Sequence, residues 1–353
     1  MKTALVIVLL WILSAGSASL ARAVCVGASV NSFGAKGYGH TDDTAAIQSA
    51  INAAGSAGGG SVVFNVARYY TTGTLVVPSG VVLCGAVEGP FDVAGVNPAL
   101  TTIAPTLLVT NTSSPFITLQ GYGTGVTDLL FHYPNQVASS AAAPNVYPYT
   151  ILVTAPGTKV ARSTATNAYN FLDIEGGRIT AQDLFIGAFN TGINVDNAGD
   201  HVSLSHILNQ VFWDVLENAP YPRPIDTWVL NHGTAMTVGV VDLEVHDFFA
   251  FSRFAGIVLN NADHCGTALG GDIDLDTVQY GILVASGCAL PGSMFTNVDI
   301  GAAPGLGQAA VQVPTGGSLP PKIEINGGSQ RGNWAIYAYP PPAPDVIIVN
   351  ILP

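Results

Sequence analysis

The stretch from Val30 to Gly85 reads VNSFGAKGYGHTDDTAAIQSAINAAGSAGGGSVVFNVARYYTTGTLVVPSGVVLCG. Thr41 and Asp42 both suit the N-cap of a helix, because their side-chain oxygens can accept hydrogen bonds from the free N–H groups of the first turn. Acidic residues there also suit the helix dipole. We therefore expect a short helix over Ala45–Ala54, which the glycines at 58–60 bring to an end.

The residues that follow this helix have the composition of strands and turns. Valines, leucines and tyrosines come in short runs, and Pro78, Ser79 and Gly80 interrupt them. β-Branched and aromatic residues favour strands, whereas Pro and Gly mark turns. We expect strands over Ser61–Phe64, Tyr70–Val77 and Val81–Gly85.

Further along the chain, short apolar segments recur at a regular spacing. One series begins with polar residues at Asp128, Asp183, Ser203 and Asp242, each followed by Leu. A second series contains residues 192–195, 256–259 and 281–284, each beginning Gly-Ile. The steps of roughly 20–29 residues indicate stacked repeats. Short strands without helices between them favour a β-solenoid over a β/α barrel, and a β-sandwich would not give a fixed period.

The N-terminal stretch also resembles a known group of proteins. Its pattern V-x-x-F-G-A-x-G-x-G-x-x-D-D-T-A-A-I-Q-x-A-I, followed by G-G-G-x-V-x-F and V-P-S-G-V-x-L-x-G, is similar to the first segment of the pectate-lyase-like superfamily. That superfamily includes rhamnogalacturonase-like and epimerase-like domains and phage tailspikes. The resemblance covers Val30 to Gly85, about a sixth of the chain. It implies an all-β, right-handed parallel β-helix with a short capping α-helix, structural roles for Asp42 and Asp43, and a polysaccharide as substrate or ligand.

The first 23 residues have the features of a secretory signal peptide. Lys2 provides a positive charge, Ala4–Leu13 is apolar, and Ala21-Arg22-Ala23 fits a cleavage site. The apolar run is shorter than the roughly 20 residues that span a bilayer. We expect a secreted protein, extracellular or periplasmic, whose residues 24–353 form one β-helix domain with its cap and first coils in 24–85. A lipid anchor on Cys25 is the alternative.

The charge of the chain limits its partners. Without Lys2 and Arg22, the 11 basic residues become 9, against 23 acidic ones, which gives a net charge of −14. Nucleic acids and anionic membranes need a basic surface, so neither is an expected partner. The acidic surface alone can also be explained by solubility. Nothing in the sequence indicates the oligomeric state.

The four cysteines can pair in three ways. Cys265 and Cys288 lie 23 residues apart, about one coil of a β-helix, so they are candidates for a disulfide between stacked coils. This pairing leaves Cys25 with Cys84. An even number of cysteines in a secreted chain is typical of disulfides, and no Cys-x-x-Cys or His/Cys cluster indicates zinc.

Two segments interrupt the repeat and are candidates for loops around a binding site. They are Tyr133–Asn170 and Ala219–Asn231, both rich in Pro. Insertions in a solenoid become loops on one face, which is often the binding face. Of the arginines near these loops, Arg223 is the first candidate for the base of a lyase, and Arg253 is the second.

The candidate functional residues fall into three groups, one of which is the pair Asp196 and Asp200. Side chains that alternate with buried leucines are expected on the outer face, where Asp242, Glu244 and His246 would lie together. Aromatic and charged residues around the second insertion suit the flat apolar faces and hydroxyls of sugars. The catalytic candidates are Asp214, Arg223, Asp226, Asp242, Glu244 and His246, and the substrate-binding candidates are Trp213, Tyr221, Trp228, Asp196 and Asp200.

Each group also has a structural explanation. Glu244 and His246 could be an ordinary exposed pair, Trp213 could lie in the core, and Asp196 and Asp200 could be turn residues. No cofactor is certain. Calcium is a possibility at the three carboxylates of residues 272–276, because calcium prefers oxygen ligands.

Three functions agree with these features. The resemblance slightly favours a lyase that cleaves a uronate-containing glycan by β-elimination. The first alternative is a glycoside hydrolase that uses paired carboxylates, such as Asp196 and Asp200. The second is a β-helix that binds glycans or has a structural role without catalysis.

Overall fold

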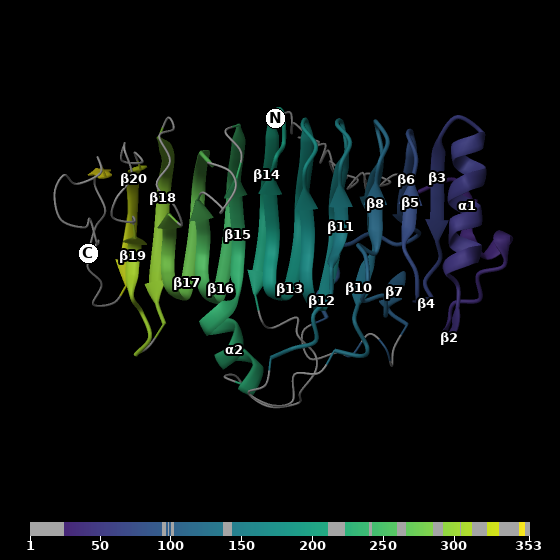
Figure 1. Cartoon of the computed structure of the whole chain (residues 1–353), viewed down its shortest axis with the longest axis horizontal. Coiled ribbons are helices and arrows are strands. Elements are labelled where there is room, and N and C mark those ends of the chain that lie inside the picture. The colour runs from purple at the N-terminus through teal and green to yellow at the C-terminus, as the bar shows by residue number, and fades with distance from the viewer. Residues whose placement is uncertain are drawn as a thin grey trace, which may run out of the picture.

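The chain folds as a right-handed parallel β-helix, in which strands from successive coils lie side by side along one long axis (Figure 1). The computed structural model describes residues 25–93, 97, 99, 102–136, 143–210, 223–239, 242–259, 266–284, 292–303, 305–312, 323–331 and 346–349. Every strand pairing in these ranges is parallel, as a solenoid requires. The fold class predicted from the sequence is therefore confirmed.

Each coil contributes to three parallel faces, which we name A, B and C. Face A contains β1 (Ala28–Ser29), β3 (Gly60–Phe64), β6 (Val81–Gly85), β9 (Gly125–Thr127) and β21 (Val346–Val349). Face B contains β2 (Tyr38–Asp42), β4 (Arg68–Thr71), β7 (Thr106–Val109) and β10 (Leu130–His132). Face C contains β5 (Leu75–Val77), β8 (Ile117–Leu119), β11 (Tyr149–Val153), β15 (Thr234–Gly239) and β19 (Ala309–Gln312).

The later strands are longer and turn from one face into the next. Those that run through all three faces are β12 (Lys159–Ile174), β13 (Ile179–Asp196), β16 (Leu243–Leu259) and β17 (Ala268–Val284). Those that run through faces A and B are β14 (Val202–Gln210), β18 (Ser293–Ala302) and β20 (Ile323–Arg331).

The N-terminal helix lies at one end of the stack, beside β3 (Figure 1). A 3-10 turn (Val30–Phe33) precedes this helix, α1 (Thr44–Ser56), which buries Ile47 and Ile51 against the first coil. The helix is longer than expected and its N-cap is Asp43, so the prediction of Thr41 or Asp42 as N-cap was wrong.

Asp42 and Asp43 have structural roles, as the resemblance implied. The buried carboxylate of Asp43 accepts backbone N–H bonds from Lys36 at 2.6 Å and Gly37 at 3.0 Å. Asp42 accepts a bond from the backbone N–H of Thr44. Because these bonds fix the path of the chain into α1, the two residues are unavailable for chemistry.

The expected strand over Tyr70–Val77 is wrong, because the chain turns a corner within it. β4 ends at Thr71 on face B, and β5 begins at Leu75 on face C. The residues between the two strands are Thr72, Gly73 and Thr74, and Gly is typical of a turn, so the corner lies at a signal that the expected strand had included.

The core is a set of columns in which one side chain of each coil stacks on the next. On face A the column includes Ala181, Leu204, Val245, Gly270 and Phe295, paired in this order through successive strands. A Cβ at Gly270 would lie 2.8 Å from the side chain of Val245 and 3.1 Å from that of Ile273, so the buried column has no room for a larger residue there. The stacked columns leave the alternate residues of each strand on the outside.

Of the two predicted repeat series, one has the register seen in the structure and the other does not. In the second, Ile257 and Ile282 are direct partners, as expected. In the first, Leu184 pairs with Ile207, and Leu204 pairs with Val245, so the predicted alignment of three leucines was out of register.

The corner between faces A and B explains this error. One residue in each coil adopts a left-handed backbone there, with φ of 61° at Asp128, 55° at Asp183, 52° at His206 and 52° at Asp247. The residue after each corner points into the core. Asp247, not Asp242, therefore continues the column that begins with Asp128 and Asp183.

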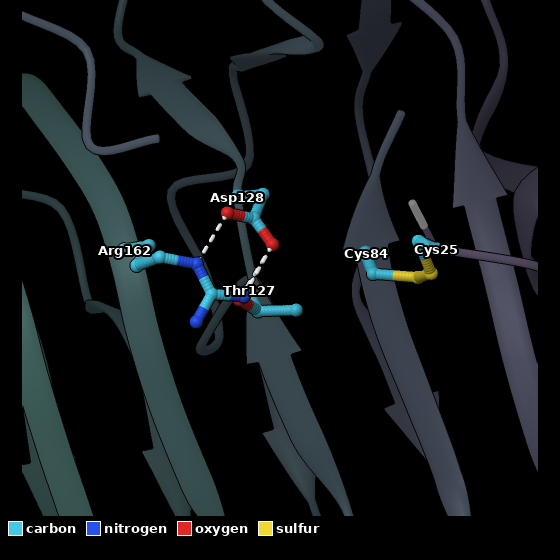
Figure 2. Close-up of a disulfide and its surroundings, with 5 residues drawn as sticks. All are labelled: Cys25, Cys84, Thr127, Asp128 and Arg162. Atoms are coloured by element: carbon cyan, nitrogen blue, oxygen red, sulfur yellow. Dashed lines mark hydrogen bonds and ion pairs between the residues drawn. A yellow bond between two sulfur atoms is a disulfide. The ribbon is translucent and has the colours of Figure 1, made fainter. Parts of the chain in front are cut away.

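Hydrogen bonds and ion pairs between neighbouring coils stabilise this corner. Arg162, which also has positive φ, donates from Nε to Oδ1 and from Nη2 to Oδ2 of Asp128, both at 2.7 Å (Figure 2). Arg162 also donates to the hydroxyl of Thr127. A left-handed conformation costs a non-glycine residue roughly 1–2 kcal/mol, and charge-assisted bonds of this kind offset such a cost.

Cys25 and Cys84 form a disulfide between β6 and the residues before β1 (Figure 2). This pairing was expected. The partners proposed at Cys265 and Cys288, and the signal peptide at residues 1–23, lie outside the described residues. None of the helices in the described ranges is long and apolar enough to cross a membrane.

Both expected insertions need correction. Residues 149–153 and 159–174 belong to β11 and β12, so the first insertion is confined to the segment before Tyr149. The second contains a helix, α2 (Pro224–His232), which lies against β13 and β16 below the stack in Figure 1.

Candidate functional site

The predicted site residues lie in three separate places. Arg223, Asp226 and Trp228 belong to α2 or its N-cap, whereas Asp242, Glu244 and His246 lie at the beginning of face A. The remaining two are at the corner from face C to face A: Asp196 ends β13 and Asp200 follows it. Trp213, Asp214 and Tyr221 lie outside the described residues.

Arg223 and Asp226 form a buried pair at the first turn of α2. Arg223 Nη2 lies 2.9 Å from Asp226 Oδ1, and the backbone N–H of Arg223 donates to Oδ2 of Asp226. Neither side chain is appreciably exposed. Asp226 caps the helix by accepting the backbone N–H of Arg223, three residues before it, and the ion pair holds the same turn, which gives both residues a structural role.

The outer surface of face A presents Glu244 and His246, both exposed as expected. His201 Nε2 lies 4.0 Å from Glu244 Oε2, and each side chain is about half exposed. Such a separation in solvent is a weak interaction. Asp200 is likewise exposed and pairs with Arg178 at 2.7 Å.

The three carboxylates expected on one side of a strand at residues 272–276 divide between two places. Asp272 has positive φ at the A–B corner, where it accepts a bond from Asn297. Asp274 and Asp276 lie on face B, within 4 Å of Nη2 of Arg331. No group of three or more His, Cys, Asp or Glu side chains in the described part of the chain could hold a metal ion.

A different group of polar side chains gathers on the outer surface of face C. Asp173 on β12 and Asn194 on β13 are direct partners in neighbouring coils, and Asn194 Nδ2 donates to Asp173 Oδ1 at 2.8 Å. Glu175 and Asp196 follow two residues later in the same two coils. With Tyr149, these four residues form what we call the face C cluster.

The electrostatic environment of Asp173 sets it apart. Burial and, to a smaller extent, the nearby charges of Glu175 and Asp196 raise its pKa to about 6 against the opposing effect of the bond from Asn194. A carboxyl group in such surroundings is partly protonated near pH 6, so it can donate a proton. Perturbed pKa values of this kind are typical of functional sites.

Tyr149 lies at one side of the cluster. It begins β11, where it pairs with Asn170 in the next coil. Burial raises the pKa of its phenol, the carboxylates of Asp173 and Asp196 raise it too, and a hydrogen bond with Thr191 opposes them. The phenol therefore stays protonated at neutral pH and can donate a hydrogen bond to a ligand.

Aromatic rings from α2 and β12 lie beside Asn170. Trp228 stacks on His232 at 4.6 Å between ring centroids, and it lies 6.1 Å from the ring of Tyr169. Asn190 Nδ2 donates to Asn170 Oδ1 at 2.8 Å. Partly exposed rings next to amides and carboxylates can contact both the CH faces and the hydroxyls of sugars.

Of the predicted residues that the structure describes, only Asp196 and Trp228 lie at or beside this cluster. Sequence reasoning missed Tyr149, Asp173 and Glu175. A usable signal was present, because residues 172–175 (LDIE) and 193–196 (INVD) share the order apolar, polar, apolar, acidic. Their spacing of 21 residues is the offset at which β12 and β13 pair here.

Comparison with known proteins agrees with the fold. Residues 27–106 match the family model described as "Rhamnogalacturonase A/epimerase, pectate lyase-like". "Alginate lyase 7" of Azotobacter vinelandii is 46% identical over 67 residues, which are 17% of this chain and 8% of that protein. The chain therefore spans only a small part of the length of this relative.

Solved structures align over most of the described fold. An α-1,3-glucanase catalytic unit from Streptomyces thermodiastaticus has a TM-score of 0.55 at 15% identity, covering 93% of this chain and 69% of that one. The Thermotoga maritima exopolygalacturonase gives 0.53 at 10%, covering 85% and 72%. The tailspike of E. coli bacteriophage HK620, in complex with a pentasaccharide, gives 0.55 at 11%, covering 87% and 58%.

Proposed function

Since the chain is a pectate-lyase-like parallel β-helix protein, we propose that it is a polysaccharide hydrolase whose active site is the face C cluster. One observation carries the proposal: Asp173, with its pKa raised to about 6, lies beside two further carboxylates on the outer surface of the sheet. Glycoside hydrolysis needs one carboxyl group that donates a proton and another that accepts one.

In this proposal Asp173 is the acid and Asp196 is the base. Asp173 donates its proton to the glycosidic oxygen as the bond from that oxygen to the anomeric carbon breaks. Asp196 accepts a proton from a water molecule as the water oxygen bonds to the same carbon. Both groups then exchange protons with solvent, which restores the starting state.

The spacing of the two residues suits a water molecule between acid and base. Adjacent strands are about 4.8 Å apart and two residues span about 6.6 Å, so the diagonal between the Cα atoms is about 8 Å. Inverting hydrolases place their carboxyl groups about 6.5–9.5 Å apart. The proposal is therefore inversion at the anomeric carbon.

The neighbouring groups would bind the sugar. Trp228 and Tyr169 offer flat apolar surfaces, and Asn170 and Asn190 offer amide donors and acceptors beside them. Tyr149 lies near both regions, because it pairs with Asn170 and the charge of Asp173 raises the pKa of its phenol. A polysaccharide bound across face C would contact rings and carboxylates together.

The comparisons support a glycan as the ligand. The names of two of the solved structures specify a glucanase and an exopolygalacturonase, and a third contains a pentasaccharide. The disulfide between Cys25 and Cys84 supports our further proposals that the protein is secreted and that residues 24–353 form one domain.

A lyase is the second candidate, because the likeness to an alginate lyase over 67 residues favours it, and Tyr149 is the residue of the cluster to consider as its base. A lyase must abstract a proton next to a uronate carboxyl and neutralise that carboxylate. Burial and the adjacent carboxylates raise the pKa of Tyr149, which disfavours a phenolate base. Hydrolysis agrees better with these surroundings.

The test is incubation of the protein, without its first 23 residues, with a panel of neutral and acidic polysaccharides. New reducing ends without ultraviolet absorbance from unsaturated uronates would support hydrolysis. Reducing ends accompanied by that absorbance would establish the lyase instead. Binding without cleavage of any polymer would leave a non-catalytic glycan-binding protein and overturn the proposal.

A further inference from the structure

We infer that the face C cluster accepts an uncharged polysaccharide and discriminates against polyuronates. This inference rests on the proposed function and specifies its substrate class. It depends on the distribution of charge over the three faces, which the proposed mechanism does not use.

The binding surface itself is negative. Asp173, Glu175 and Asp196 contribute carboxyl groups, and Asn194 and Thr237 continue the column as neutral side chains. The paired outer positions of face C, within the described ranges, include no Lys or Arg. A uronate carboxylate bound there would meet like charge without a fixed cation.

The arginines that flank face C already form ion pairs or hydrogen bonds within the protein. Arg223 pairs with Asp226 at the N-terminus of α2, and Arg178 pairs with Asp200 at the corner to face A. Arg253 is fully buried and donates to Asn209 and to a backbone carbonyl. Recruiting any of these guanidinium groups to a uronate would break a bond that the fold already makes.

The other two faces extend the negative surface. Glu244 and Asp247 are exposed at face A and its corner. Asp274 and Asp299 lie on face B, where a single Arg331 faces them. With the net charge of −12 for the full sequence, a polyanion would be repelled both on approach and at the site.

A neutral glycan avoids this cost and uses the same groups well. Carboxylates and amides accept and donate hydrogen bonds to sugar hydroxyls, and charged acceptors make the stronger bonds. The CH faces of the sugar rings can lie on Trp228 and Tyr169 without regard to charge. Face C therefore favours sugars that present hydroxyl groups over sugars that carry carboxylates.

The test uses pairs of polymers that share a backbone and differ only in charge. Suitable pairs are methyl-esterified and de-esterified polygalacturonan, and a glucan and its carboxymethyl derivative. Binding is measured at low salt with Asp173→Asn, so that the polymers are not cleaved. We expect the neutral member of a bound pair to bind about tenfold tighter, and the difference to shrink as salt screens the charges.

A variant that removes one negative charge from the face C cluster tests whether the cluster causes the preference for neutral polymers. Glu175→Gln in the same background should reduce the preference for the neutral polymer, whereas Glu244→Gln removes an equal charge from face A, farther from the bound sugar, and should reduce it less. Equal or tighter binding of the acidic member would overturn this inference, even if hydrolysis is confirmed. Failure of every polymer to bind would overturn the proposed function and this inference together.

Discussion

Asn194 Nδ2 donates a hydrogen bond of 2.8 Å to Oδ1 of Asp173, and this bond joins two neighbouring coils at the proposed acid. The bond orients the carboxyl group and also lowers its pKa, because it stabilises the ionised form. Burial acts in the opposite direction and dominates, so that the pKa rises to about 6. The properties of Asp173 thus depend on residues that pair only in the folded coil.

Asp173→Asn should abolish most of the turnover, because the amide has no proton to donate to the leaving oxygen. Loss of an acid catalyst typically costs about 10²–10⁴-fold, and we expect a fall in kcat of at least about 100-fold. Initial rates of reducing-end formation would measure it, with the Tm as the check on folding. Asp200→Asn, at an exposed pair outside the cluster, is the matched control and should retain activity.

The pH dependence should move in opposite directions in two variants. Because hydrolysis needs protonated Asp173, the rate should fall as the pH rises through about 6. Glu175→Gln removes a charge that raises this pKa, so the fall should occur at lower pH. Asn194→Ala removes the bond that lowers it, so the fall should occur at higher pH. Profiles of kcat would show the shifts, and movement of both variants in the same direction would contradict the assignment.

The sequence predicted the fold because the relevant information is local. The N-terminal motif of Val30–Gly85 and the apolar alternation of each strand specify one turn of the β-helix without reference to the turns on either side of it. The direct pairing of Ile257 with Ile282 shows that such a spacing can even give the register. The helix α2 was missed because prolines and polar residues around Pro224 suggested only a loop.

The candidate site was harder to predict, because register decides which polar residues meet. A corner residue of positive φ, such as His206 or Asp247, changes which later residues point outward. Asp and His are enriched in that conformation but adopt it in a minority of cases, so the residue type alone does not locate the corner. Asp173 and Asp196 are 23 residues apart, and only the pairing of β12 with β13 brings them together.

The disulfide should contribute substantially to stability. Cys25 and Cys84 are 59 residues apart, and a loop of that length corresponds to about 4 kcal/mol in the chain-entropy model. Reducing agent should lower the Tm of the wild-type protein. Cys25→Ser should start from a lower Tm than the wild type and respond less to the reductant. A wild-type Tm that reductant leaves unchanged would be inconsistent with this contribution.

Arg162 should stabilise the corner between faces A and B. Arg162→Ala would remove both bonds to Asp128, whose side chain is 9% exposed, and leave its carboxylate with the backbone N–H of Gly89 and the hydroxyl of Thr127. We expect a loss of about 2 kcal/mol, since bonds to charged groups are worth about 1.5–3 kcal/mol. Denaturant unfolding would measure it. Arg178→Ala, which breaks an exposed pair, should cause no resolvable change.

Trp228 should contribute to substrate binding more than to the chemical step. It lies on α2 against His232 and Tyr169, beside the cluster and not within it. Trp228→Ala would remove an apolar surface of the kind that stacks on sugar rings, an interaction worth roughly 0.5–1.5 kcal/mol beyond the area that it buries. We therefore expect KM to rise by about tenfold while kcat changes little.

Trp228→Phe keeps a flat ring at the same position and should recover most of the affinity. A structural role would give a different pattern, because the loss of packing around α2 would lower the Tm of the Ala variant and reduce kcat together with affinity. A kcat that falls as far as that of Asp173→Asn, with KM unchanged, would instead place Trp228 in the chemical step and contradict its assignment to sugar binding.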